Sequence, residues 1–365
     1  MTTKNHLALL FILSSGLAAA EPRAKNVILF LGDAGGIPTL NAAGIRAHDK
    51  PQGLYLHSFK HIALSDTSSR DRWVTDSAAG MTAIVTGHKT NNGMLSLLPA
   101  ENGAPEQPLK TILEYAEERG LSTGVVTNMG VWDATPAACY SHVASRKSTA
   151  EIFKHALKPR FGDGVDILVG VEKGLIAAAQ KDGWDVMQGL RDANYQVYAS
   201  PGEIPADARR AVSIYQGNDF VPGPVISKII KSLARNPKGF FLMVEWDMHT
   251  EKTILGLDRV IVMDNLIRQA AAEAPADTLI VYAADHSFDF RLRGGRKDEP
   301  MAAQIDAQLA APTPPVKPVF QVENSHSGEE ILVAAQGPGA ERLGGFIPNT
   351  QIFHVMMDAY GWTEN

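Results

Sequence analysis

Short apolar runs alternate along this chain with longer stretches in which apolar and polar residues are mixed. The short runs are rich in β-branched residues, which favours strands, and the longer stretches have a helical character. The expected strands cover residues 27–31, 124–127, 167–169, 240–244, 278–282 and 331–333. The expected helices cover residues 109–118, 152–157, about 254–274 and 350–360. This alternation predicts βαβ units and therefore an α/β fold, with a mainly parallel central sheet and helices on both faces.

The chain is long enough and apolar enough to bury a large core. It has 365 residues, of which 45% are hydrophobic and 20% are charged, so disorder is not expected. Residues 291–322 are rich in proline, alanine and charge, and we expect a flap or insertion there rather than part of the sheet. The sequence contains neither an internal repeat nor a low-complexity linker, and residues 21–365 are expected to form a single domain.

The first residues have the pattern of a secretory signal peptide. A basic residue at Lys4 precedes an apolar run over residues 7–17 and three alanines at 18–20. A transmembrane anchor is the alternative, but the run is shorter than the roughly 20 apolar residues that span a bilayer. We therefore expect residues 1–20 to be a cleaved signal peptide and the mature protein to be periplasmic or secreted, without a membrane anchor.

Charge and cysteine content narrow the class of partner. The formal net charge is -6 and there is no run rich in lysine and arginine, so the chain lacks the basic field that nucleic-acid binding requires. A small molecule is the expected partner. The single cysteine, Cys139, cannot form an internal disulfide, so an exported protein of this sequence would depend on its core and on bound ions for stability.

Polar residues follow several of the expected strands directly. In open α/β sheets, ligands bind beyond the carboxyl ends of the strands. Carboxylates and imidazoles without thiolates suit zinc at some positions and magnesium at others. Any one of these residues could be an ordinary surface side chain, but their recurrence after strand upon strand favours a metal centre. The candidate ligands are Asp33, Glu245, Asp247, His249, Asp285, His286 and His326.

A candidate nucleophile lies in the segment 73–83, at the expected junction of a loop and a helix. A helix N-terminus presents free amides to an anion, which places Ser77 where a phosphate could bind. Serine at such a position is also a common helix cap, and this segment alone does not decide between the two roles. There is no histidine within a few residues to act as its base. A bound zinc ion could lower the pKa of the hydroxyl instead.

Taken together, these segments resemble the alkaline phosphatase family from about Lys25 to the end of the chain. The resemblance implies a three-layer sandwich, one catalytic domain, two zinc ions and one magnesium ion, and a homodimer. The matching segments are Asn26–Asp33, Val74–Ala83, Thr86–Gly93, Asp133–Ala138, Ser141–Arg146, Ala284–Ser287 and His326–Glu329.

The resemblance assigns roles to five further positions. Ser77 is implied as the phosphorylated serine and Asp76 as a neighbour of the metals. Thr135 is implied as a magnesium ligand and Asp133 as a partner of the waters on that ion. Arg146 is implied as the phosphate clamp, and a planar guanidinium is suited to hold two phosphate oxygens at once. The alternative for Arg146 is an ordinary surface arginine.

The chain departs from the family pattern around Glu245. The family spaces its glutamate, zinc aspartate and zinc histidine more widely, whereas here they are compressed into a few residues. Glu245 is expected as the magnesium ligand and Asp247 as a zinc ligand. His249 is a less secure third member, and Glu251 is an outside candidate. Smaller departures are Ser327 in place of a threonine and the residues that follow Asp33.

The implied reaction is a two-step phosphoryl transfer from a phosphate monoester through a phosphoserine. The zinc ion beside Ser77 would take Asp33, Asp285 and His286 as ligands. The other zinc ion would take Asp247, His326 and His249. The magnesium ion would take Asp33, Thr135 and Glu245. A phosphodiesterase or sulfatase on the same metals is an alternative, since fold does not choose the ester. Another is a non-catalytic periplasmic protein that binds phosphate or metal. The physiological substrate and pH optimum do not follow from the sequence.

Overall fold

The computed structural model describes residues 23–364 except for 218–219, 314 and 316, so the expected signal peptide lies outside the described residues. Within the described part, ten strands form one sheet. Only β13 runs antiparallel to its neighbours, and the remaining pairs are parallel. In sheet order the strands are β14 (Gly345–Ile347), β2 (His61–Ser65), β13 (Ile331–Gln336), β10 (Thr278–Ala284), β1 (Asn26–Asp33), β9 (Phe240–Asp247), β5 (Ser122–Gly130), β6 (Ile167–Val171), β8 (Ala211–Tyr215) and β7 (Gln196–Val197).

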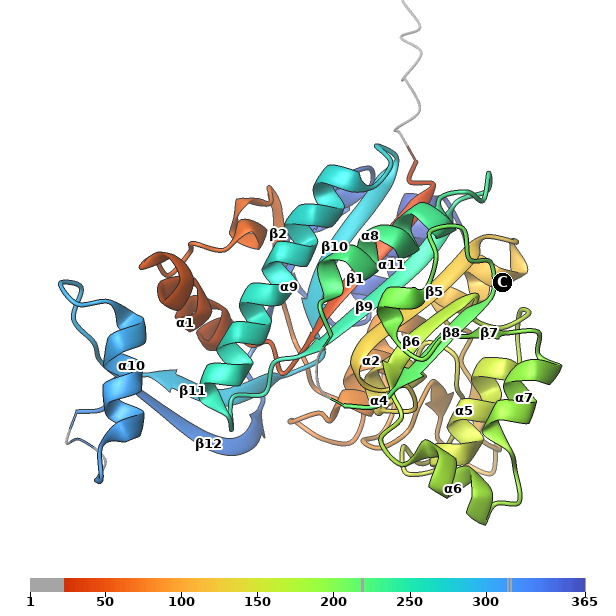
Figure 1. Ribbon diagram of the computed structural model, residues 1–365, viewed down its shortest axis with the longest axis horizontal. Coiled ribbons are helices and arrows are strands. Elements are labelled where there is room, and N and C mark those ends of the chain that lie inside the picture. Colours follow the sequence, from red (N-terminus) through yellow and green to blue (C-terminus); the bar gives the residue numbers. More distant parts are fainter. Residues whose placement is uncertain (1–22, 218–219, 314, 316, 365) are drawn as a thin grey trace, which may run out of the picture.

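Helices cover both faces of this sheet (Figure 1). The expected α/β fold with a mainly parallel sheet is therefore confirmed. Short 3-10 helices lie at Tyr55–Ser58, Pro201–Glu203 and Ala340–Arg342. The α-helices are α1 (Ile37–His48), α2 (Ser77–Thr86), α3 (Ile112–Glu118), α4 (Ala134–Ala137), α5 (Thr149–Leu157), α6 (Leu175–Lys181), α7 (Val186–Asp192), α8 (Pro222–Leu233), α9 (Thr253–Glu273), α10 (Met301–Ala310) and α11 (Gln351–Tyr360).

Alternate residues of β1 face opposite sides of the sheet and anchor two cores. Val27, Leu29 and Leu31 pack on the side covered by α2, α3, α5 and α11. Ile28 and Phe30 pack on the side covered by α1, α8 and α9. Because β1 is buried on both faces, it is a continuous apolar run rather than an alternating one.

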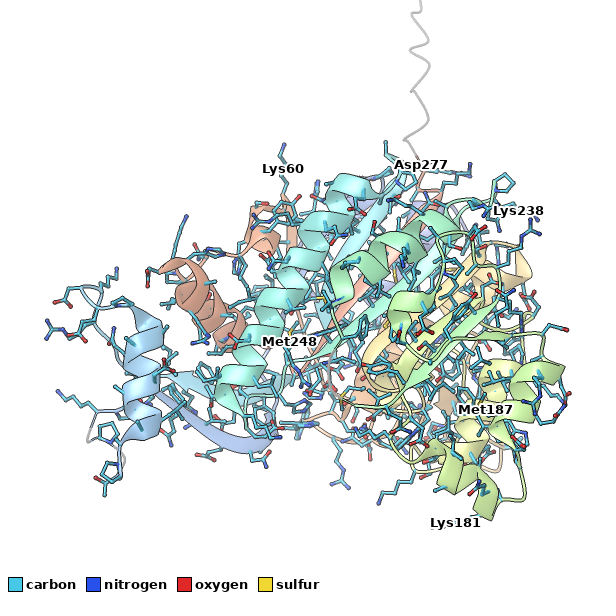
Figure 2. The ribbon with its side chains drawn as sticks, in the orientation of Figure 1. Lys60, Lys181, Met187, Lys238, Met248 and Asp277 are labelled. Atoms are coloured by element: carbon cyan, nitrogen blue, oxygen red, sulfur yellow. The ribbon has the colours of Figure 1, made fainter. Side chains whose placement is uncertain are left out.

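Apolar side chains fill the core, and charged side chains lie at the surface. Met248, just beyond β9, is fully buried in the core beneath α9, whereas Lys60 and Lys181 are exposed at the periphery (Figure 2). Among the described helices, none combines the length and the apolar character needed to cross a membrane.

The register of the central strands brings their carboxyl ends to one place. Asp33 at the end of β1 lies opposite Asp247 at the end of β9, and Gly32 lies opposite Ala284 at the end of β10. Asp285 follows directly. Parallel neighbours therefore deliver three polar strand ends to the same edge of the sheet.

A separate two-stranded sheet stands outside the main one. It pairs β11 (Ser287–Leu292) with β12 (Phe320–Ser327), and α10 lies between them in the chain at the far end of the molecule from α7 (Figure 1). Phe288 pairs with His326 in its register. This hairpin returns His326 to the point where the chain leaves β10. A second small hairpin pairs β3 (Leu97–Leu98) with β4 (Gln107–Pro108).

Candidate active site

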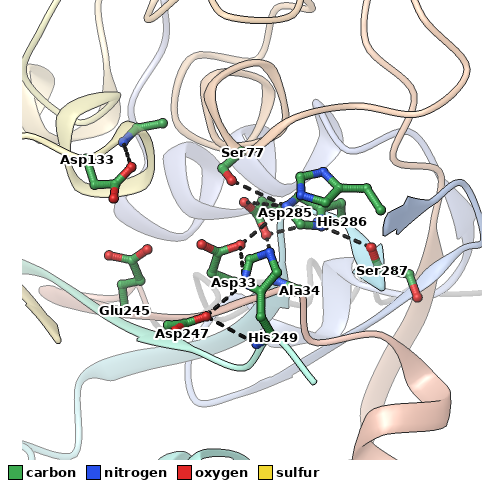
Figure 3. Close-up of polar contacts among 12 residues, drawn as sticks. Asp33, Ala34, Ser77, Asp133, Glu245, Asp247, His249, Asp285, His286 and Ser287 are labelled. Carbon is green, nitrogen blue, oxygen red and sulfur yellow. Dashed lines mark hydrogen bonds and ion pairs between the residues drawn. The ribbon is translucent and has the colours of Figure 1, made fainter. Parts of the chain in front are cut away.

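Ser77 is the first residue of α2, and Asp76 rather than Ser77 caps this helix. The Asp76 side chain accepts a hydrogen bond from the backbone N of Ala79 at 3.1 Å. The Ser77 hydroxyl is therefore not used as a cap. Its Oγ lies 3.3 Å from Nε2 of His286, and the residue is 3% exposed (Figure 3).

A glycine allows α2 to approach the end of β10 this closely. A Cβ atom added at Gly80 would lie 2.6 Å from the backbone oxygen of Asp285, closer than real Cβ atoms approach. The same turn of helix carries Ser77. The small residue at position 80 thus brings the serine hydroxyl to the Asp285–His286 pair.

Three possible metal-ligand atoms converge beside Ser77, from His286, Asp33 and Asp285. His286 Nδ1 donates to the backbone oxygen of Ser287 at 3.0 Å, so the neutral imidazole has its lone pair on Nε2. This Nε2 lies 3.3 Å from Asp33 Oδ1 and 3.6 Å from Asp285 Oδ2, and neither oxygen has a hydrogen-bond partner among the described residues. Both distances exceed the roughly 2.7–2.9 Å of a charge-assisted hydrogen bond. The arrangement fits a cation held between the three atoms.

A second cluster adjoins the first. His249 Nδ1 lies 2.8 Å from Asp247 Oδ1 and 3.8 Å from Asp33 Oδ1. The His326 ring stacks on His286 at a centroid distance of 3.7 Å, and its Nδ1 donates to the backbone oxygen of Thr75 at 3.1 Å. The Nε2 lone pair of His326 is therefore also left for a ligand.

Three overlapping groups of these residues have ligand atoms within 4.8 Å of one another. The sequence-predicted residues that come together in this way are Asp33, Asp247, His249, Asp285, His286 and His326. The outside candidate Glu251 is exposed in a turn and belongs to none of the three groups.

Glu245 lies on the other side of Asp33 from this cluster (Figure 3). It is 1% exposed, accepts hydrogen bonds from Thr127 and Thr135, and its Oε1 has no hydrogen-bond partner among the described residues. Thr135 lies in α4, a single helical turn capped by Asp133. Thr127 was not a sequence candidate, because it lies within β5 and no motif marks it.

Arg146 is held between two carboxylates. Its Nη1 donates to Asp76 Oδ2 and its Nη2 to Asp133 Oδ1, each at 3.1 Å. Lys173 Nζ donates to the other Asp133 oxygen at 3.1 Å. Sequence reasoning missed Lys173, which comes from the turn after β6 and has a left-handed backbone with φ of 43°.

Burial opposes ionisation of two carboxylates of the site, Asp285 and Glu245, whereas the neighbouring histidines favour ionisation of Asp33. It raises the pKa of Asp285 to about 6, and the nearby charge of Asp33 adds to this. The pKa of Glu245 lies well above its usual range for the same two reasons. Burial would also raise the pKa of Asp33, but His249 and His286 outweigh it and hold that pKa below its usual range. Such a group of acids requires positive charge nearby.

The histidines divide by charge state. Burial, reinforced by His286, lowers the pKa of His326 to about 4, so this imidazole is neutral with a lone pair available. Burial also disfavours a charged His249, but Asp33 and Asp247 dominate and raise its pKa to about 9. A divalent ion that binds here would take the place of that proton, since an imidazole must be neutral to coordinate a metal.

Comparison with known proteins identifies the family. The alkaline phosphatase family model matches residues 24–173 and 223–313. Alkaline phosphatase of Escherichia coli K12 is 27% identical, and the match covers 94% of this chain and 87% of that protein. The human tissue-nonspecific isozyme of alkaline phosphatase is also 27% identical, and the match covers 91% of this chain and 83% of that protein.

Solved structures agree in fold. Alkaline phosphatase from the Antarctic bacterium TAB5 superposes with a TM-score of 0.77 at 24% identity, over 94% of this chain and all of that one. The alkaline phosphatase of Thermus thermophilus gives the same TM-score at 20% identity, over 98% of this chain and 97% of that one. The resemblance found in the sequence is thereby confirmed. The chain belongs to the alkaline phosphatase family of metal-dependent enzymes and is a phosphatase that acts on phosphate monoesters.

Proposed function

We propose that this protein hydrolyses phosphate monoesters through a phosphoserine formed on Ser77, at a centre that holds two zinc ions and one magnesium ion. The observation that supports this most directly is the position of Ser77 Oγ, 3.3 Å from His286 Nε2. That nitrogen lies 3.3 Å from Asp33 Oδ1 and 3.6 Å from Asp285 Oδ2, two oxygens without a hydrogen-bond partner among the described residues. A hydroxyl placed against a cation site is positioned to become a nucleophile.

The ligand sets proposed are those that the family resemblance implies, and the clustering of these side chains supports them. Asp33, Asp285 and His286 would hold the zinc ion beside Ser77. Asp247, His249 and His326 would hold the zinc ion on the side of the leaving group. Asp33, Thr135 and Glu245 would hold magnesium, and the unpartnered Glu245 Oε1 supports that assignment. When bound, these ions lower the pKa of the hydroxyl and neutralise charge on the transferred group.

The chain's own residues orient the two steps. Ser77 Oγ attacks phosphorus, so an Oγ–P bond forms while the ester P–O bond breaks and the alcohol leaves with a proton. Water then cleaves the phosphoserine, restores the Ser77 hydroxyl and releases phosphate. One water is consumed and one alcohol released per turnover, so atoms and protons balance.

Arg146 is suited to hold two oxygens of the phosphoryl group during both steps. Its guanidinium is fixed in place by Asp76 and Asp133, and Lys173 adds a second positive charge at Asp133. A guanidinium that can hold two phosphoryl oxygens favours a dianionic monoester over a diester or a sulfate, each of which has less negative charge. We also propose that residues 21–365 act as one catalytic domain, exported after loss of residues 1–20, and that two copies form a homodimer.

The test is Ser77→Ala, with Ser213→Ala as its control. Ser213 is a buried serine of β8 whose hydroxyl has no hydrogen-bond partner among the described residues. Ser77→Ala should reduce turnover of p-nitrophenyl phosphate by at least about a thousandfold at unchanged metal content, and Ser213→Ala should leave turnover intact. Acid quenching of the parent with labelled substrate should trap phosphate on Ser77.

The alternatives predict different results in the same experiment. Retained activity in Ser77→Ala would refute the nucleophile. A parent that binds metal without turning over any ester would be a binding protein. Faster turnover of bis-p-nitrophenyl phosphate or p-nitrophenyl sulfate than of the monoester would identify a diesterase or a sulfatase.

A further inference from the structure

Arg259 contacts a carboxylate of the site, although it lies outside the sequence segments that resemble the family. It lies in the second turn of α9, and its Nη1 donates to Asp247 Oδ2. Both side chains are largely buried, with 16% of the arginine and 12% of the aspartate exposed. An arginine that donates to a largely buried carboxylate forms a charge-assisted hydrogen bond, which is stronger than one between neutral groups.

The two oxygens of Asp247 have different partners. Oδ2 faces Arg259, whereas Oδ1 accepts from the backbone N of His249 at 3.1 Å and lies 2.8 Å from its Nδ1. The backbone N of Asp247 donates to the side chain of Asn128 at 2.9 Å. The carboxylate is therefore restrained on each side, and Oδ1 is the oxygen that points toward His249.

The local chain restrains only Oδ1 of Asp247, through His249. Strand β9 ends at Asp247, and only Met248 separates it from His249. Helix α9 does not begin until Thr253, so no helical turn fixes the two candidate ligands relative to each other. The restraint on Oδ2 comes from another element, because Arg259 of α9 donates to it.

We propose that Arg259 is a positioning residue for the zinc ion on the side of the leaving group, where it keeps Asp247 as a ligand through Oδ1 alone. This inference rests on the proposed function, in which Asp247 coordinates that ion. Hydrogen-bonded partners that orient a ligand typically change metal affinity by about 10–100-fold when removed.

Two effects of Arg259 oppose one another. Its positive charge repels a metal ion, so its removal would favour binding, whereas loss of the fixed Asp247 orientation would weaken binding. Because the compressed segment offers Asp247 no other side-chain restraint on Oδ2 among the described contacts, the orienting effect outweighs the charge. The sign of the change in zinc retention distinguishes the two.

The experiment measures zinc release from the full chain loaded with zinc and magnesium. The variants are Arg259→Met and Arg259→Gln, and the control is Arg46→Met. Arg46 is matched because it is 17% exposed and pairs at 2.8 Å with Asp258, the neighbour of Arg259 on the same helix. Zinc per chain and its rate of transfer to a chromogenic chelator are recorded, together with thermal unfolding.

We expect one zinc equivalent to leave Arg259→Met about tenfold faster than the parent, while the other equivalent leaves at the parental rate. Arg259→Gln keeps an N–H donor without the charge, and its rate of zinc release should lie between those of the parent and Arg259→Met. Arg46→Met should behave like the parent. If Arg259→Met does not fold, Arg259→Gln alone decides, and release at least threefold faster is the expected result.

Unchanged or slower release in the Arg259 variants would overturn the inference, because the arginine would then act structurally or through charge alone. Equally fast release from Arg46→Met would also overturn it, since the effect would then arise from the packing of α9. These outcomes are distinct from failure of the proposed function, which would appear as a parent that holds no zinc or as an active Ser77→Ala.

Discussion

Asp33 and Asp247 lie opposite each other at the ends of the adjacent parallel strands β1 and β9, although they are far apart in the sequence. The His249 ring reaches both, with Nδ1 at 2.8 Å from Asp247 Oδ1 and 3.8 Å from Asp33 Oδ1. Asp33 also reaches His286. One carboxylate thus links the two candidate zinc sites, and Glu245 lies on its other side.

Because Asp33 adjoins both candidate zinc sites, its substitution should lower metal content more than substitution of any other ligand. Asp33→Asn should lose zinc and magnesium together, whereas Asp285→Asn should lose mainly the zinc ion beside Ser77. Metal per chain after dialysis measures this, and the loss of affinity in Asp33→Asn should exceed the 10–100-fold typical of outer partners.

Asp49→Asn is the control for the change of charge. Asp49 is exposed and has a left-handed backbone with φ of 50°, which asparagine tolerates well. Equal metal content in Asp33→Asn and the parent would contradict the shared-ligand geometry.

The strands that deliver these ligands could be predicted, because each is a buried apolar run followed at once by a polar residue. Strands β1, β9 and β10 extend the expected ranges by only a few residues. Helix α3 begins later than expected, at Ile112, because Thr111 and Glu114 form a capping box there.

Contacts between distant elements could not be predicted. Lys173 comes from a turn, Arg259 from the second turn of a helix and Thr127 from the middle of a strand. At these positions no spacing distinguishes them from surface or core residues. His326 was expected just ahead of a strand of the main sheet, but it lies within β12 of the separate hairpin. Helix α8 begins at Pro222 and was not predicted.

Removal of the Arg146 guanidinium should weaken binding of phosphate in both the transition state and the product complex. We expect Arg146→Ala to lower kcat/KM for p-nitrophenyl phosphate by about 10²–10³-fold and to raise the inhibition constant of inorganic phosphate. Lys147→Ala removes the same charge from the exposed neighbouring residue and should change neither. An Arg146→Ala enzyme with parental inhibition by phosphate would show that Arg146 does not contact the substrate.

Gly80 provides a test of the approach of α2 to β10. In Gly80→Ala, the new methyl group would collide with the backbone oxygen of Asp285 and move Ser77 away from His286. Turnover should fall by about 10²-fold, the loss that a displacement of about 1 Å can cause, although alanine is the better helix former. Gly202→Ala, where a Cβ would meet nothing within 4 Å, is the control and should retain full activity. Parental kcat in Gly80→Ala would mean that α2 tolerates the displacement.

Glu117 lies in α3 beside the start of β5, at the end of that strand away from the site, and should limit stability at alkaline pH. Its carboxylate accepts from the backbone N of Gly164 at 3.1 Å and from the Thr123 hydroxyl at 3.3 Å, and the residue is 6% exposed. Burial raises the pKa of Glu117 from 4.5 to about 8, and nearby Asp163 adds to this. The folded protein therefore binds this proton more tightly than the unfolded chain does.

Because the folded pKa is the higher one, stability is fully present below pH 4.5 and is lost as the pH rises toward and through 8. Glu117→Gln mimics the protonated acid. It should unfold at the parental temperature at pH 4.5 and at a higher temperature at pH 9, with a gain on the order of 2–4 kcal/mol. Glu118→Gln alters the exposed neighbour that pairs with Lys110 and should not reproduce this pH dependence. A Glu117→Gln melting temperature that follows the parent at every pH would mean that Glu117 ionises in the folded protein as freely as in the unfolded chain.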